Sequence, residues 1–113
     1  MMNRQSYDKV QQLFRNHAAH AEPTVKDMQL FQVPAALRVL ADAEAGGLEL
    51  WGIEGFKVFP PGGIRPHIEH TLDFAELGLP MNEFYQAAKR FLSERIAEDL
   101  WFELTITDKK RNS

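Results

Sequence analysis

The sequence predicts an α+β fold in which three helices cover one face of an antiparallel sheet of about three strands. Three observations predict it. Apolar residues recur at helical spacing in three segments, two β-favouring runs flank the turn sequence Pro-Pro-Gly-Gly, and the last apolar segment alternates strictly. In chain order these segments give α-α-β-β-α-β, a two-layer sandwich. The 113 residues fit one domain, 1–113, because no linker-like stretch divides them.

Two helices are expected ahead of the sheet. The first covers about residues 7–19, where apolar side chains follow the i, i+3, i+4, i+7 spacing of one buried stripe. The second covers about residues 34–45, since proline suits its first turn and Gly46-Gly47 suits a left-handed end. The stretch 24–32 between them has no clean period, so a loop or a short helical turn is expected there.

A β-hairpin is predicted around the turn Pro60-Pro61-Gly62-Gly63. Its first strand is apolar on both sides, which indicates a central position in the sheet. If Phe59 lies opposite Ile64, then Glu54 lies opposite Glu69. Four apolar residues of the second half are expected to pack on the helices: Ile64, Ile68, Leu72 and Phe74.

A helix and a strand follow the hairpin. The helix is expected over about residues 83–98, where apolar residues again recur at helical spacing. Residues 100–107 alternate apolar with polar or half-polar side chains, which predicts a strand with one buried face. Residues 109–113 are expected to form a flexible tail.

Composition excludes several classes of function. The chain has no cysteine, so disulfides, thiolate nucleophiles and cysteine zinc sites are excluded. No apolar run is long enough to cross a membrane, and residues 1–16 carry charges where a signal peptide is apolar, so we expect a cytoplasmic protein with no membrane partner. The net charge of −3 argues against nucleic acid. Seven acidic and two basic residues between positions 42 and 76 give this middle segment a charge of −5, unless they are only scattered solvated carboxylates.

The four histidines form two pairs at i, i+3, which raises the question of a metal site. Residues three apart on a regular strand point to opposite faces, so His67 and His70 are not expected to bind one ion unless Pro66 distorts the strand. His17 and His20 could share a helix face, but no carboxylate nearby in the sequence completes a site. We therefore expect no metal and no cofactor; hydrogen-bonded or exposed histidines are the simpler interpretation.

A possible catalytic cluster lies on the predicted polar face of the hairpin. There Glu54, Glu69 and His67 would place two carboxylates beside an imidazole, the components of general acid/base catalysis. A surface ion pair of Glu54 with Arg65 or Lys57 is the alternative. The sequence contains no Gly-x-Ser-x-Gly elbow and no phosphate-binding glycine loop. We therefore assign no catalytic residue, and a small enzyme or ligand-binding protein is the competing hypothesis.

The segment 48–74 favours recognition of another protein, because aromatic residues alternate with carboxylates in it. Tryptophan and phenylalanine give large rigid contact areas, while carboxylates complement a basic partner. The candidate partner-binding residues are Trp51, Glu54, Phe56, Arg65, His67, Glu69 and Asp73. In the alternative interpretation the aromatic residues of this segment belong to the core.

A predicted helix leads through Gly46-Gly47 into the segments LWGIEGFKVF and IRPHIEHTLDF. This pattern resembles small immunity proteins of bacterial polymorphic-toxin and contact-dependent inhibition systems. The resemblance covers about half of the chain. It implies a cytoplasmic protein that binds and neutralises a cognate toxin domain, often a nuclease, and an acidic face would suit a basic toxin. A homodimeric structural protein that pairs through the sheet face or the last strand is a third hypothesis.

Overall fold

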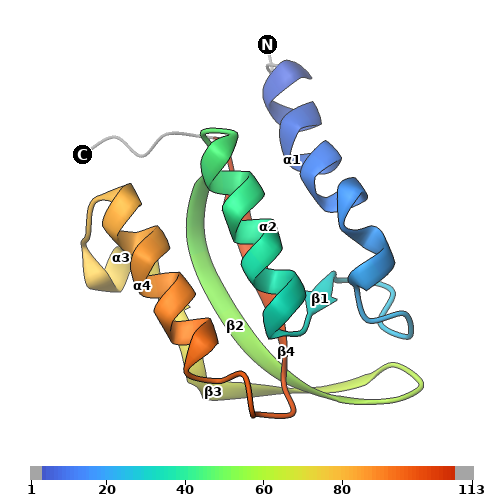
Figure 1. Cartoon of the computed structure of the whole chain (residues 1–113). Coiled ribbons are helices and arrows are strands. Elements are labelled where there is room, and N and C mark those ends of the chain that lie inside the picture. Colours follow the sequence, from blue (N-terminus) through green and yellow to red (C-terminus); the bar gives the residue numbers. More distant parts are fainter. Residues whose placement is uncertain (1–3, 109–113) are drawn as a thin grey trace.

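An antiparallel sheet with strand order β1-β4-β2-β3 forms the centre of the molecule (Figure 1). The structure is a computed structural model that describes residues 4–108, and within that range the sheet has four strands. They are β1 (Leu30–Phe31), β2 (Glu49–Phe59), β3 (Gly63–Asp73) and β4 (Trp101–Thr107). The α+β class and the antiparallel sheet are confirmed, and β2 lies inside the sheet as its apolar residues indicated. The predicted tail, 109–113, lies outside the described residues.

Two helices cover one face of this sheet. In Figure 1, α2 and α4 lie side by side over β2 and β4, and α1 packs against α2 on its other side. The helical elements of residues 4–108 are α1 (Arg4–Asn16), the 3₁₀ turn η1 (Ala18–His20), α2 (Val33–Ala45), α3 (Phe74–Leu77) and α4 (Met81–Ser93). None of these described helices is long and apolar enough to span a membrane.

The core lies between the sheet and the α2–α4 pair. Strand β4 contributes alternate residues to it, with Phe102, Leu104 and Ile106 buried. The Tyr85 hydroxyl of α4 donates a 2.8 Å hydrogen bond to the carbonyl oxygen of Leu48, which fixes α4 over the start of β2. Burial raises the pKa of Tyr85, so this hydroxyl stays protonated and keeps its hydrogen bond.

Strand β1 and helix α3 were not predicted. The stretch expected to be a loop, 24–32, contains β1, whose two fully buried residues pair with Phe102 and Glu103 of β4. Two residues are too few to show an alternation, which explains the miss. Helix α3 follows the hairpin directly, because the Asp73 side chain caps it by accepting a 2.8 Å hydrogen bond from the Ala75 amide. The helix predicted over 83–98 ends five residues early, and turns follow it.

The hairpin forms at the predicted turn, but its register is different. Glu54 lies opposite Thr71, while the next residue, Gly55, lies opposite His67. Three residues of β3, 68–70, are therefore extra, and we call them the β3 bulge. The expectation that Ile64 and Ile68 pack on the helices is wrong, since they are 38% and 83% exposed. The bulge breaks the alternation on which that expectation depended.

Candidate functional site

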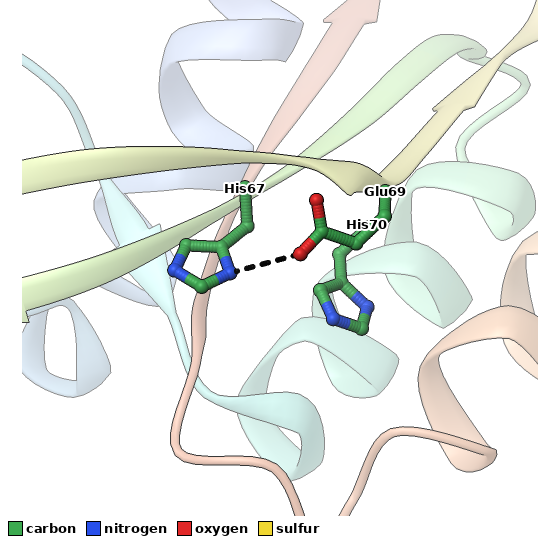
Figure 2. Close-up of side chains that lie close together, drawn as sticks. All are labelled: His67, Glu69 and His70. Atoms are coloured by element: carbon green, nitrogen blue, oxygen red, sulfur yellow. Dashed lines mark ion pairs between the residues drawn. The ribbon is translucent and has the colours of Figure 1, made fainter.

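The β3 bulge brings two histidines and a glutamate together. Figure 2 shows the side chains of His67, Glu69 and His70 converging on one side of the bulge. The distance between His67 Nδ1 and Glu69 Oε1 is 3.4 Å, and the two imidazole centroids are 6.0 Å apart. The expectation that His67 and His70 point to opposite faces is therefore wrong, because it assumed a regular strand. We call these three residues the bulge cluster.

Arg95, just beyond α4, closes one side of the bulge cluster. Its Nε donates a 3.0 Å hydrogen bond to His70 Nδ1, so in the neutral ring the hydrogen is on Nε2. Its Nη1 donates to the Phe91 carbonyl oxygen at 2.8 Å, and its guanidinium carbon lies 3.8 Å from the centroid of the Phe91 ring. These contacts to Phe91 hold the guanidinium in place independently of His70.

Glu69 supplies a negative charge to the cluster. The pKa of Glu69 is lowered, first because its own backbone N–H donates to the carboxylate, and also because His67 and His70 lie nearby; partial desolvation opposes this. The Glu69 side chain is 69% exposed and that of His67 is 28% exposed. The cluster is therefore accessible from solvent, and its carboxylate is ionised at neutral pH.

The other histidine pair, His17 and His20, does not form a cluster. His17 Nε2 lies 2.7 Å from Asp42 Oδ2, so the end of α1 is tied to α2. His20 is exposed on η1. The carboxylate that pairs with His17 comes from a distant helix, which sequence spacing alone did not indicate.

A second candidate site lies on the sheet face turned away from α2 and α4, which we call the open face. The pairing of β2 with β4 places buried Ile53 opposite Leu104, so the neighbouring pairs project to the open face. Glu54 lies directly opposite Glu103 there, and Gly52 lies opposite Thr105. The residues of the open face used below are Glu49, Trp51, Glu54, Thr71, Asp73, Trp101, Glu103 and Thr105.

The open face is acidic. It carries the carboxylates of Glu49, Glu54, Asp73 and Glu103, and within strands 49–59, 63–73 and 101–107 the outward positions outside the bulge hold no lysine or arginine. Burial raises the pKa of the Glu103 carboxyl, and the adjacent Glu54 raises it further. Like charges directly opposite each other destabilise a sheet. The fold therefore tolerates an electrostatic cost at this position.

A shallow depression of about 210 Å³ lies on the open face, lined by Trp51, Glu54, Thr71, Asp73 and Thr105 among others. The sheet has a second irregularity, in β2 between Leu50 and Gly52, and Trp51 is its extra residue. Its indole Nε1 donates a 2.9 Å hydrogen bond to Glu49 Oε1, which orients the ring. A larger hollow of about 530 Å³, between α1, residues 27–29 and β4, contains none of the predicted site residues.

The structure divides the predicted partner-binding residues between different places. Trp51, Glu54 and Asp73 lie on the open face; Phe56 pairs with Trp101 on that same face but is only 4% exposed. Alternation turns Arg65 and His67 to the opposite side of β3 from Pro66, and Glu69 lies in the bulge. The predicted cluster of Glu54, His67 and Glu69 is therefore not formed. Glu103 and Arg95 were not among the predicted residues, because their neighbours depend on strand order and on the bulge.

Comparisons of this chain with protein-family models and with curated proteins find no match. The likeness to immunity proteins therefore stays a hypothesis from the sequence. The function has to be inferred from the open face and the bulge cluster themselves.

The repulsion on the open face has a measurable consequence. Because the pKa of Glu103 is raised in the folded state, ionising this carboxyl costs stability, and the free energy of unfolding falls as pH rises through that pKa. We expect Glu103→Gln to raise the free energy of unfolding at pH 7 by about 0.5 kcal/mol after solvent screening. The gain should vanish near pH 3, where the glutamates are protonated. Urea unfolding at both pH values checks this, with exposed Glu98→Gln as the control; a loss of stability at pH 7 would contradict it.

Proposed function

We propose that this protein is a binding module whose open face docks against a basic surface of another protein. The observation that carries the proposal is the composition of that face: four carboxylates and two partly exposed tryptophans, with no lysine or arginine at the outward positions of strands 49–59, 63–73 and 101–107 outside the bulge. Such a face attracts a partner of opposite charge and repels acidic ones.

The arrangement of Glu54 and Glu103 supports recognition over a purely structural role. Their side chains lie opposite each other on rigid, paired strands, so they lose little conformational freedom on binding. A lysine or arginine from a partner, placed between them, would relieve the repulsion that the free protein carries. Trp51 and Trp101 add rigid apolar area beside these charges, as anchor residues do at protein interfaces.

The resemblance to immunity proteins suggests a narrower form of this proposal. In that form the partner is a basic toxin domain, the binding neutralises it, and the protein acts in the cytoplasm. A nuclease domain that binds nucleic acid has the positive surface that the open face would complement. The acidic open face supports this narrower proposal, which requires that the partner's contact surface be positively charged.

Charge reversal on the open face tests the proposal. A partner is first captured from source cells with the wild-type chain and identified, and its purified form is then titrated by calorimetry at 50 and 200 mM salt. We expect Glu54→Lys and Glu103→Lys each to weaken binding by about 10- to 1,000-fold, and wild-type binding to weaken as salt rises.

The matched control is Glu98→Lys, which makes the same charge change at an exposed turn after α4. It should bind like the wild type. If both open-face variants bind like the wild type, or if the purified partner has an acidic contact surface, the open face is not the docking site.

A further inference from the structure

The β3 bulge interrupts the pairing of β3 with β2 and changes the direction of the side chains in it. It inserts Ile68, Glu69 and His70 between the ladder pairs Gly55–His67 and Glu54–Thr71, and it leaves Ile68 83% exposed. In a regular strand the two histidines would point to opposite faces. Bulges of this kind re-aim side chains and are common beside functional sites. Here the gain is the convergence of three side chains with metal-binding atoms.

The spacing within the bulge cluster suits a small ion. One ligand atom of each residue lies within 4.8 Å of the others. The 3.4 Å between His67 Nδ1 and Glu69 Oε1 already matches the separation of about 3.3 Å between two ligands on a tetrahedral zinc ion. His70 has to approach by rotating its side chain, which is only partly buried.

The hydrogen bond from Arg95 to His70 decides when that third ligand is available. A neutral imidazole has one nitrogen lone pair in its plane, and Arg95 Nε occupies it at Nδ1. His70 therefore cannot bind an ion through either nitrogen while this bond exists. His70 can rotate away from Arg95 while the guanidinium keeps its contacts to Phe91.

We infer that His67, Glu69 and His70 form a binding site for one zinc-class divalent transition-metal ion, and that Arg95 competes with the ion for His70. Two imidazoles and a carboxylate are a known three-ligand set for Zn²⁺, with a fourth position open to water or another ligand. Imidazole ligands disfavour Mg²⁺ and Ca²⁺, which prefer oxygen. The site lies in the bulge, so this inference does not depend on the function proposed for the open face.

Calorimetric titration with ZnCl₂ tests the site. The sample is the full chain, freed of any affinity tag and then dialysed against a chelator. We expect one equivalent of Zn²⁺ to bind. His67→Ala and His70→Ala should each weaken binding by more than about tenfold, the loss that removing even an outer partner of a metal site brings. Glu69→Gln, a conservative change on an exposed side chain, should weaken it as well. The matched control is His20→Ala, which removes an exposed histidine outside the cluster and should leave binding unchanged.

Arg95→Met separates this site from adventitious binding to surface histidines. The variant keeps an unbranched apolar stem on Phe91 but removes both the charge and the donor to His70, so it should bind Zn²⁺ about tenfold more tightly. Far-UV circular dichroism and the Tm verify that each variant is folded. Three results would overturn the inference: no binding by wild type or Arg95→Met, equal losses in His20→Ala and His67→Ala, or no gain in Arg95→Met.

Discussion

Replacing Gly55 with alanine should destabilise the protein by about 1–3 kcal/mol and disturb the bulge cluster at the same time. A β-carbon at this buried position would lie 3.0 Å from both the Cβ and the carbonyl oxygen of His70, and 3.2 Å from Phe102 Cε1. Because Phe102 is enclosed by the core, the alanine has to push the backbone of the bulge outward. His70 should then move away from His67 and Glu69.

Gly52→Ala is the matched control for that substitution, since it lies in the same strand. Its β-carbon would meet one neighbour, the Leu72 carbonyl oxygen at 3.3 Å. Alanine also loses less conformational entropy than glycine when the chain folds, which favours the folded state by about 0.5–1 kcal/mol and offsets a mild contact. The free energy of unfolding, measured in urea, should be clearly lower for Gly55→Ala than for Gly52→Ala. Histidine ring NMR signals should shift only in Gly55→Ala. Equal stability of the two variants would show that Gly55 is not needed for the close approach of the bulge.

Phe102→Ala should produce the largest loss of stability, about 3–5 kcal/mol, which is the usual cost of removing a buried phenylalanine ring. Phe102, the second residue of β4, is fully buried, and its ring packs edge-on against Phe91 with centroids 6.2 Å apart. Phe91 also supports Arg95, so the cavity would loosen the closed side of the bulge cluster. A loss of this size is a large part of the stability of a small domain.

Thr105→Ala, on the same strand, is the control for Phe102→Ala. Thr105 is exposed on the open face, so its truncation should change the free energy of unfolding by no more than about 0.5 kcal/mol. Equilibrium urea unfolding measures both variants. A small loss for Phe102→Ala would mean that the core does not depend on the contact between β4 and α4.

Periodic features of the sequence predicted most of the fold. The helices at 33–45 and 81–93, the hairpin and the strand at 101–107 all follow from apolar spacing and the Pro-Pro-Gly-Gly turn. Features without a period were missed: β1 has two residues, and α3 is a single turn that depends on its cap at Asp73. The position of β4 between β1 and β2 was also unpredictable, because strand order depends on long-range packing.

The candidate sites were predicted less well for the same physical reason. Three of the seven predicted partner-binding residues, Trp51, Glu54 and Asp73, do share the open face. The pairing of Glu54 with Glu103 was not predictable, since it requires the strand order. Regular alternation argued against a joint role for His67 and His70, and the three-residue bulge reverses what that alternation predicts. Pro66, the residue named as a possible cause of distortion, lies in the edge strand β3 one residue before His67, and proline within sheets is confined to edge strands and bulges.

The central claim, that the open face is where a basic partner docks, is tested most directly by amide NMR of the labelled protein titrated with that partner. We predict that the largest shift changes fall on Glu54, Thr71, Glu103 and Thr105 and on the Trp51 indole, while the buried side of α2 and α4 stays unchanged. Changes confined to α1, α2 or α4, with the open face unaffected, would contradict the claim.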